Sequence, residues 1–340
     1  MYLAVVWQDN QEKNKLSFIR HKAFYSGNLL INYKFSSRTT NNQQLLSRFY
    51  FGSFIRVTKM KKYSVYLWAG AAWWVTLFSG QVAAVSLVAP KPLFVGAQKP
   101  VALRVMTYNV HHCNPPSQPD SIDLAAITKV IRAQNPDLVA LQEIDVNTQR
   151  SGPFNQAAEI AKALNMRFFF GKAIDHGGGD YGVAILSKYP LTETTVHRLP
   201  TKPETKGEPR IVVTAKVTLP AGLAIRFGST HLDAQRDSVN RQMQVVEISR
   251  LATTEKLPFI IAGDFNAPPA SNVIKALDQH FTRTCRTCEP TIPVANPAQA
   301  IDFIAYTPTK KFKVVKTTVV PEKYASDHLP VVAEVSFIGK

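Results

Sequence analysis

Short apolar segments that each end near a polar residue recur along residues 101–340 and constrain the fold more than any other feature of the sequence. These segments are four to ten residues long and rich in Val, Ile, Leu and Phe, which favours strands. The expected strands are 101–110, 138–141, 166–170, 181–186, 194–199, 211–219, 223–230, 259–262, 301–306, 313–319 and 331–337. Segments with helical spacing lie between them, at 122–133, 154–164, 239–252 and 272–277. We therefore expect an α/β fold of the α+β type, in which two mixed sheets pack face to face with helices outside, as one domain over 101–340.

Local signals set the expected helix ends. Asp120 or Ser121 is the expected N-cap of the helix at 122–133, and Pro136 is expected to stop that helix. The helix at 239–252 is long and is expected to be amphipathic.

The positive charge of the chain is concentrated near its beginning. The formal net charge is +16, but residues 1–59 hold nine Lys or Arg against two Asp or Glu, whereas residues 91–340 hold 29 against 22. The later part is therefore only mildly basic for its size. It also lacks the dense basic run, or the basic strip interleaved with aromatic residues, that duplex-binding proteins display.

Residues 60–84 have the composition of an export signal. Lys61 and Lys62 precede a stretch without charge up to Lys91, its apolar core is 65–78, and small residues end it near Ala84. We expect a signal peptide here, or alternatively a membrane anchor, because the apolar run is long enough to cross a bilayer. Residues 85–100 would then be a linker, and the protein would be exported: periplasmic, secreted or membrane-anchored.

Residues 1–59 are unusual because a signal peptide belongs at the start of a chain. We hypothesise that Met60 is the true initiator and that residues 1–59 are a non-native or disordered basic extension. N-terminal sequencing of the native protein tests this hypothesis.

The cysteines are Cys113, Cys285 and Cys288. Export permits disulfides, so Cys285 and Cys288 are expected in a plain loop or in one small disulfide. A zinc site or a redox pair is less well supported, because there is no second CxxC motif and no histidine at zinc spacing nearby.

Polar residues suited to metal binding and proton transfer stand at the ends of the predicted strands. They are Asn109, Glu143, His231, Asp264, Asn266, Asp302, Asp327 and His328. Because strand ends from several segments can converge on one rim of a packed sheet protein, we expect these side chains to meet there. The set has hard oxygen ligands and two histidines but no cysteine, which suits Mg²⁺ or Mn²⁺ better than Zn²⁺. Hydrolysis of a phosphate ester needs such a set: a cation on the phosphoryl oxygens, a base for water, and donors for the developing charge.

Seven motifs follow one another along the chain: TYNVHH, LQEID, YGVAILSKYP, STHLD, GDFNA, AIDFIAY and SDHLPV. Their order resembles the endonuclease/exonuclease/phosphatase superfamily, which includes deoxyribonuclease I, abasic-site endonucleases, sphingomyelinases and inositol polyphosphate 5-phosphatases. The resemblance covers residues 101–340 and implies a four-layer αββα sandwich.

The resemblance implies a metal centre. Glu143 is similar to the principal metal ligand, with Asn109 beside it on the neighbouring strand end. Asp327 is similar to an additional metal ligand or a supporting acid. The expected cofactor is Mg²⁺ or Mn²⁺.

The resemblance also implies catalytic roles. His328 resembles the general base or phosphate-binding histidine, and Asp302 the acid that orients its ring. Asp264 matches the residue that activates water or protonates the leaving group. His328 and Asp264 are therefore alternative candidates for the general base. Asn266 matches a donor to the phosphate, and His231 a stabiliser of the pentacovalent oxyanion.

Three further residues are candidates for substrate binding. Arg210 precedes a strand and is expected to reach the rim as a phosphate clamp, and Arg150 is expected to line the same mouth. Two histidines follow Asn109 where related proteins often have an acid, and His111 is our candidate to face the substrate. Val183 stands where many members have an Asn that contacts phosphate, so one donor of the nuclease type is missing.

We expect a divalent-metal-dependent phosphoesterase that cleaves a phosphodiester or phosphomonoester with activated water. One alternative is a secreted endonuclease that acts on DNA or RNA. Another is a catalytically inactive binding domain, against which the presence of Glu143, Asp264 and His328 argues. The expected partner is the phosphate-ester substrate, as a small molecule, lipid headgroup or nucleic acid. No obligate protein partner is evident, and we expect a monomer.

Overall fold

The computed structural model describes residues 100–338 throughout and, before them, the backbones of six short strands between residues 18 and 77. The chain divides into two compact units, Met1–Leu93 and Phe94–Lys340. In the first unit, β1 (Phe18–Phe24), β2 (Leu30–Thr39), β3 (Leu45–Arg48) and β6 (Trp74–Leu77) form a sheet, and β4 (Ile55–Arg56) pairs with β5 (Tyr66–Leu67). Apart from these strand backbones, the predicted basic extension, export signal and linker lie outside the described residues, and all three stay predictions. Among the described helices, none has the length and apolar character needed to cross a membrane.

The second unit contains two six-stranded sheets. The first sheet has the order β17-β18-β7-β8-β10-β9, and the second has the order β11-β12-β13-β14-β16-β15. The strands are β7 (Val101–Asn109), β8 (Leu138–Val146), β9 (Arg167–His176), β10 (Gly179–Ser187), β11 (Leu191–Arg198), β12 (Ile211–Thr218), β13 (Ala224–His231), β14 (Phe259–Asp264), β15 (Thr282–Arg283), β16 (Asp302–Thr307), β17 (Phe312–Val319) and β18 (Val331–Phe337). The helices are α1 (Leu124–Gln134), α2 (Gln156–Leu164), α3 (Val239–Thr254) and α4 (Asn272–Leu277), with short 3₁₀ turns η1 (His111–Cys113), η2 (Pro203–Thr205), η3 (Pro220–Gly222) and η4 (Thr309–Lys311). In each sheet one pair of strands is parallel, β7 with β8 and β13 with β14, so both sheets are mixed.

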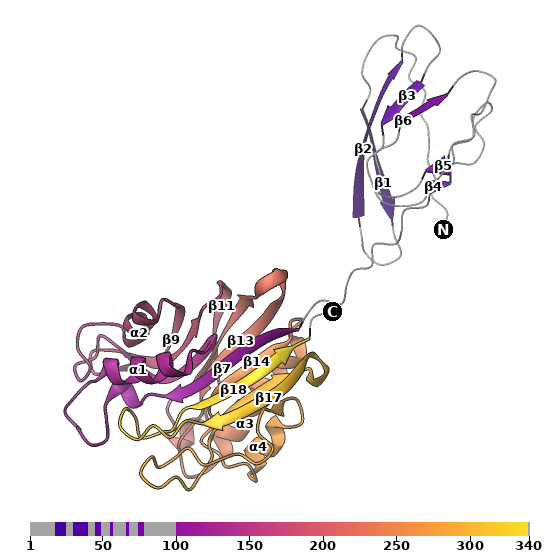
Figure 1. Cartoon of the computed structure of the whole chain (residues 1–340). Helices are drawn as coiled ribbons and strands as arrows, with labels where there is room; N and C mark the ends of the chain where they lie inside the picture. Colours follow the sequence, from indigo (N-terminus) through magenta and orange to yellow (C-terminus); the bar gives the residue numbers. More distant parts are fainter. Residues whose placement is uncertain are drawn as a thin grey trace. The chain divides into compact units, whose positions relative to one another are not determined.

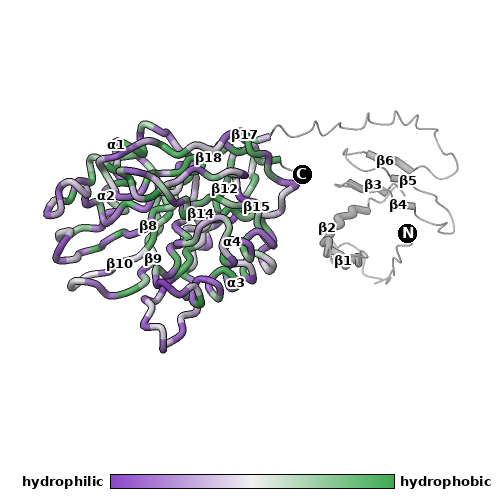
Figure 2. Tube along the Cα trace, turned by 90° about the horizontal axis from the view of Figure 1, so that it is seen from below, coloured by the Kyte–Doolittle hydropathy of each residue, from purple (hydrophilic) through white to green (hydrophobic). Residues whose placement is uncertain are grey.

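Alternation along the strands builds three apolar layers. Val105 of β7 and Ile260 of β14 belong to the core between the two sheets. Met106, one residue on, faces the opposite side of the first sheet, where α1 and α2 pack. Helices α3 and α4 cover the outer face of the second sheet, and Figure 1 shows the two helix pairs on opposite sides of the sheets. In Figure 2 the hydrophobic residues run along the central strands and the hydrophilic ones lie in peripheral loops. The predicted four-layer αββα sandwich is confirmed.

The helices differ from the sequence prediction in two ways. The N-cap of α1 is Asp123, whose Oδ1 accepts a hydrogen bond of 2.8 Å from the Ala126 N–H, so the prediction of Asp120 or Ser121 is wrong. Helix α3 was expected to be amphipathic, but it buries polar as well as apolar side chains. The guanidinium of its Arg241 donates to the backbone oxygens of Asp233 and Gln235. This contact fixes the loop that follows β13.

The cysteines divide as the sequence suggests. Cys285 and Cys288 form a disulfide, which confirms one of the two structures expected for them, and Cys113 is a buried free thiol. The two-residue strand β15, just before Cys285, was not predicted, because two residues carry no periodic signal.

Candidate active site

Strand ends from both sheets meet at one edge of the sandwich. The parallel strands β7 and β8 end there in the first sheet, and β13 and β14 end there in the second. Strands β12, β16 and β18 are antiparallel to these neighbours and therefore begin at the same edge. A hydrogen bond of 3.1 Å from Asn109 Nδ2 to Asp264 Oδ2 joins the two sheets at this edge. The prediction that polar strand ends converge on one rim is thus confirmed for these two residues.

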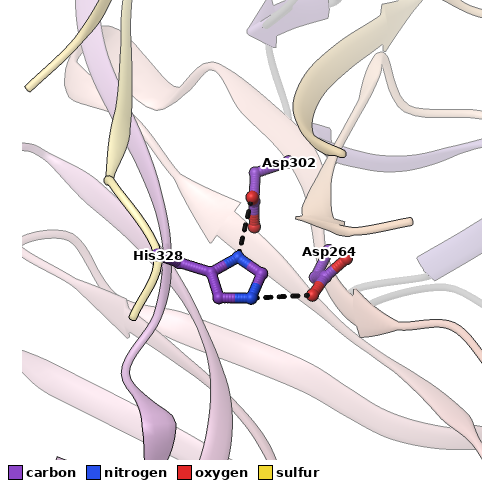
Figure 3. Close-up of side chains that lie close together, drawn as sticks. All are labelled: Asp264, Asp302 and His328. Atoms are coloured by element: carbon purple, nitrogen blue, oxygen red, sulfur yellow. Dashed lines mark hydrogen bonds and ion pairs between the residues drawn. The ribbon is translucent and has the colours of Figure 1, made fainter. Parts of the chain in front are cut away.

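A buried histidine lies between two buried carboxylates at this edge (Figure 3). His328 Nδ1 is 3.0 Å from Asp302 Oδ2, and His328 Nε2 is 3.7 Å from Asp264 Oδ2. Thr291 Oγ1 donates a further hydrogen bond of 2.6 Å to Asp302 Oδ2. The imidazole orientation expected from the pairing of Asp302 with His328 is therefore present.

The environment sets unusual pKa values for this group. Burial alone would lower the pKa of His328, but the carboxylates of Asp302 and Asp264 raise it to about 10. Burial, together with the charge of Asp302, raises the pKa of Asp264 to about 7. In this arrangement the imidazole holds its proton at neutral pH, while Asp264 exchanges a proton near neutrality.

Asn109 connects Asp264 with Glu143. Its Nδ2 donates to Glu143 Oε1 and to Asp264 Oδ2, at 3.1 Å each, and its Oδ1 accepts from the His111 N–H. Ser326 Oγ donates to the Asn109 carbonyl at 2.7 Å, which ties the loop before His328 to the end of β7. In this structure Asn109 therefore bridges the two carboxylates as a donor. Metal binding through its Oδ1 remains a prediction.

Glu143 lies on a β-bulge rather than at the end of its strand. On β10, Gly182 pairs with Ile144 and Ala184 pairs with Leu141, so two residues of β8 stand opposite Val183 alone. Glu143 has a φ of 58°, which is a left-handed conformation that non-glycine residues rarely adopt. A bulge of this kind re-aims a side chain, and it explains how Glu143 reaches the site while β8 continues to Val146.

Glu143 is held ionised. Burial raises the pKa of its carboxyl, but the nearby imidazoles of His112 and His231 and the Asn109 amide together keep that pKa well below its usual range. An ionised and largely buried carboxylate is the kind of ligand that a divalent cation needs.

His231 and Arg210 line the side of the site formed by the second sheet. His231 Nε2 is 3.6 Å from Asp264 Oδ2, and its buried Nδ1 has no hydrogen-bond partner among the described residues. Burial and the Arg210 charge lower the pKa of His231 well below its ordinary value, so the ring is neutral. Arg210 is buried, lies 3.1 Å from Glu208 through Nη2, and is close enough to the phenol of Tyr181 to offset part of the rise that burial causes in the pKa of Tyr181. Sequence reasoning missed Tyr181, although it opens the YGVAILSKYP motif.

Four other predicted residues make contacts within the protein that differ from the roles predicted for them. Asn266 Nδ2 donates to the Leu232 carbonyl, and the Asn266 N–H donates to Asp264 Oδ1. Arg150 donates a bidentate pair of hydrogen bonds to the carboxylate of the buried Asp145. The Asp327 carboxylate lies 3.4 Å from Ser326 Oγ, outside the Asp264–Asp302–His328 cluster. The His111 ring is 3.0 Å from the Asn114 carbonyl. The roles given to these residues, phosphate donor, substrate ligand and metal ligand, remain predictions.

His112 is the histidine of the pair that faces the site. Its Nδ1 lies 3.8 Å from Glu143 Oε2 and has no hydrogen-bond partner among the described residues. Sequence reasoning selected His111. The adjacent His112 carried the same signal, and only the surroundings of the two rings in the structure distinguish them.

The residues present fit a divalent metal ion. Asp264 and Asp302 offer carboxylate oxygens within 4.8 Å of each other, beside the protonated ring of His328. On the other side of Asn109, Glu143 adds an ionised carboxylate, and one amide group serves both Glu143 and Asp264. Buried carboxylates that share a single amide donor are incompletely neutralised, and their hard oxygens suit Mg²⁺ or Mn²⁺.

A model of the endonuclease/exonuclease/phosphatase family matches residues 106–328 of this chain. The chain belongs to this family. Its members are hydrolases of phosphate esters and generally depend on divalent metals, and the matched range spans the site from the strand of Asn109 to His328.

Individual proteins are also similar to this chain. The Escherichia coli K12 protein YbhP is 25% identical over 252 residues, which cover 69% of this chain and 96% of YbhP. An endonuclease/exonuclease/phosphatase from Beutenbergia cavernae has a TM-score of 0.61 at 26% identity, over 71% of this chain and 72% of that chain. A mannosyl-6-phosphatase from Bacteroides thetaiotaomicron has a TM-score of 0.57 at 20% identity, over 69% of this chain and 100% of that chain. The last likeness is one of fold.

Proposed function

We propose that this chain is a divalent-metal-dependent phosphoesterase that uses activated water. The observation that carries the proposal is the placement of Asp264. Its buried carboxyl lies 3.7 Å from the ring of His328, 3.6 Å from the ring of His231, and is joined through Asn109 to the ionised Glu143. A proton acceptor, cationic and neutral donors, and a metal-binding carboxylate thus stand within one buried site.

Glu143 would hold the ion, together with Asn109 once its Oδ1 faces the metal. When bound, the ion would polarise the phosphoryl oxygens and offset their developing charge. Asp264 then accepts a proton from the attacking water, because its pKa of about 7 is matched to neutral pH. Of the two candidates for the general base, His328 and Asp264, we therefore propose Asp264.

The histidines and Arg210 act on the phosphoryl group. His328 is kept protonated by Asp302 and presents its Nε2–H to a phosphoryl oxygen. Neutral His231 donates to the same developing charge from the second sheet. Arg210, with a buried Nε that has no partner among the described residues, clamps a non-bridging oxygen.

A small phosphate ester is the substrate class that we favour over a polynucleotide. Val183 is 3% exposed and packs in the core between the sheets, so it offers the phosphate no donor. The sugar phosphatase of the same fold from Bacteroides thetaiotaomicron supports a small substrate.

Turnover by metal-stripped protein with added Mg²⁺ or Mn²⁺ tests the proposal. Bis-p-nitrophenyl phosphate, p-nitrophenyl phosphate, inositol phosphates, sphingomyelin and plasmid DNA are assayed in parallel. We expect metal-dependent hydrolysis of at least one small ester, and its loss in Asp264→Asn and His328→Ala variants that melt like the wild type. Asp278→Asn is the control, because Asp278 is exposed and its ion pair among the described residues is with Arg283. A folded wild-type protein that turns over none of these esters with either metal would refute the proposal.

Export is a separate part of the proposal. Residues 60–84 would act as a signal peptide or a membrane anchor, and the mature enzyme would lie outside the cytoplasm. N-terminal sequencing of the native protein checks this, and a mature chain that begins at Met1 would contradict it.

A further inference from the structure

Three consecutive residues after β7 adopt a conformation that L-amino acids rarely use. His111, His112 and Cys113 have φ values of 47°, 43° and 61°. Side chains other than Gly, Asn and Asp visit this left-handed region seldom, and runs of it are rarer still. Such conformations persist where the surroundings over-determine them, and they cluster at functional sites.

The surroundings of this turn hold its backbone from several sides. Gln156 Nε2 donates a hydrogen bond of 2.6 Å to the His112 carbonyl, and the Asp123 N–H donates one of 2.7 Å to the Cys113 carbonyl. The Cys113 side chain is fully buried among α1, α2 and the first sheet. The turn therefore presents His111 and His112 in fixed directions.

The two imidazoles have different surroundings. The Nδ1 of His111 is engaged by the Asn114 carbonyl at 3.0 Å. The Nδ1 of His112 is buried and without a hydrogen-bond partner among the described residues, and it lies 3.8 Å from Glu143 Oε2. Glu143 is itself held in a left-handed conformation on its bulge. Two strained backbones thus bring one imidazole nitrogen and one ionised carboxylate to face each other.

The distance between these two atoms suits a shared metal ion. A gap of 3.8 Å is too long for a hydrogen bond. With metal–ligand bonds of about 2.1 Å, two ligands of one ion lie about 3 Å apart when adjacent and about 4.2 Å apart when opposite. The observed gap falls between these limits.

We propose that His112, through Nδ1, is a ligand of the divalent ion that Glu143 holds, and that it makes this centre select a transition metal such as Mn²⁺ over Mg²⁺. The inference rests on the proposed metal dependence. Its chemical reason is that Mg²⁺ strongly prefers oxygen ligands and keeps its waters, whereas first-row transition ions accept an imidazole nitrogen.

Metal binding to the stripped full-length protein tests the inference without using turnover. Titration calorimetry gives the Mn²⁺ and Mg²⁺ affinities, and pulsed EPR of bound Mn²⁺ detects coupling to a ligand nitrogen. For the wild type we expect Mn²⁺ to bind at least about tenfold more tightly than Mg²⁺. We also expect a ¹⁴N coupling that becomes a ¹⁵N coupling in protein labelled with [¹⁵N]histidine.

His112→Asn is the decisive variant, because Asn tolerates the left-handed conformation and offers oxygen in place of imidazole nitrogen. It should lose the histidine coupling and reduce the Mn²⁺/Mg²⁺ affinity ratio by about tenfold or more. His111→Asn is the matched control, because His111 has a similar left-handed φ but its ring contacts the Asn114 carbonyl. This variant should retain the histidine coupling and the Mn²⁺/Mg²⁺ affinity ratio.

The outcomes separate this inference from the proposed function. Mn²⁺ bound to the wild type without histidine coupling, or coupling and selectivity unchanged in His112→Asn, would overturn the role of His112 and leave the phosphoesterase proposal intact. Failure of the wild type to bind any divalent ion would overturn both. If His112→Asn does not fold, the variants His231→Asn and His328→Asn must each retain the coupling; its loss in either would assign it to that histidine and refute the inference.

Discussion

Replacement of Asp302 by Asn is expected to lower the pKa of His328 strongly. Asp302 Oδ2 lies 3.0 Å from His328 Nδ1 and accepts a 2.6 Å hydrogen bond from Thr291 Oγ1, and all three residues are buried. The amide of Asn has the same shape as the carboxyl group but no charge. The substitution therefore removes the electrostatic partner of the imidazole with little change in packing.

The size of the effect follows from the pKa of His328. It is raised from 6.5 to about 10, and a pKa difference of one corresponds to about 1.4 kcal/mol. The protonated ring of the metal-free protein is thus favoured by about 5 kcal/mol, on the order of the stability of a small domain. Asp302 is the largest contributor that raises this pKa, ahead of Asp264 and Asp327. We therefore expect His328 of the variant to titrate below about pH 8.

The sign of the pH dependence is fixed by the direction of this change. Since the pKa of His328 is higher in the folded than in the unfolded protein, its proton contributes stability that is fully present below about pH 6.5. That contribution is lost as the pH rises through about 10. The free energy of unfolding of the metal-free wild type should therefore fall between pH 7 and 10, and the Asp302→Asn profile should be flatter there.

Two measurements check this prediction. Urea unfolding in EDTA at several pH values gives the stability profile, and histidine-ring NMR gives the pKa of His328. Turnover of the metal-loaded variant should fall by about 10²–10⁴ because the ring loses its proton and its orientation. Asp278→Asn, at an exposed carboxylate, should change none of these quantities. If the His328 ring of Asp302→Asn still titrates near pH 10, the electrostatic reasoning is wrong.

Three further variants test other parts of the structure. Glu143→Gln should abolish the rise in melting temperature that Mn²⁺ gives the wild type, because the ionised carboxylate is lost; an unchanged rise in scanning fluorimetry would exclude Glu143 as a ligand. Gly182→Ala should destabilise the protein by about 2 kcal/mol or more in urea, since its Cβ would collide with the Gly171 carbonyl oxygen; an unshifted midpoint would contradict the register of β9 and β10. Replacement of Cys285 and Cys288 by Ser should cost about 2 kcal/mol, as expected for closure of a short loop, and should leave turnover intact; a loss of turnover would mean that the disulfide shapes the site.

The strands and their common edge were predictable because they depend on local composition. The segment 331–337 is a strand over those same residues, and 272–277 is a helix with the predicted bounds. Polar residues at the ends of buried strands indicated the rim, and Asn109, His231, Asp264, Asp302 and His328 do meet there. Apolar periodicity fixes which strands are buried, and the register of neighbouring strands then places their ends together.

The orientation of particular side chains was not predictable, because it depends on the backbone and on tertiary partners. Nothing in the sequence LQEID shows that Glu143 adopts a left-handed φ on a bulge. Which of His111 and His112 faces Glu143 depends on a turn with left-handed backbone conformations, and the composition does not reveal this turn. Arg150 was predicted to line the rim, yet the Nε–Nη2 edge of its guanidinium donates to the buried Asp145, five residues earlier.

The first and last strands of the catalytic unit are neighbours, and Val101 pairs with Phe337. This pairing lies at the edge of the sheet opposite the site, because β7 begins there and β18 ends there. A short peptide joining these two positions would close the unit into a ring without crossing the catalytic mouth. New ends opened at the exposed turn of Ala221 and Gly222, between β12 and β13, would fall at that same remote edge. The arrangement of these ends suits circular permutation, and sensors or tags attached at the new ends would lie at the edge opposite the site.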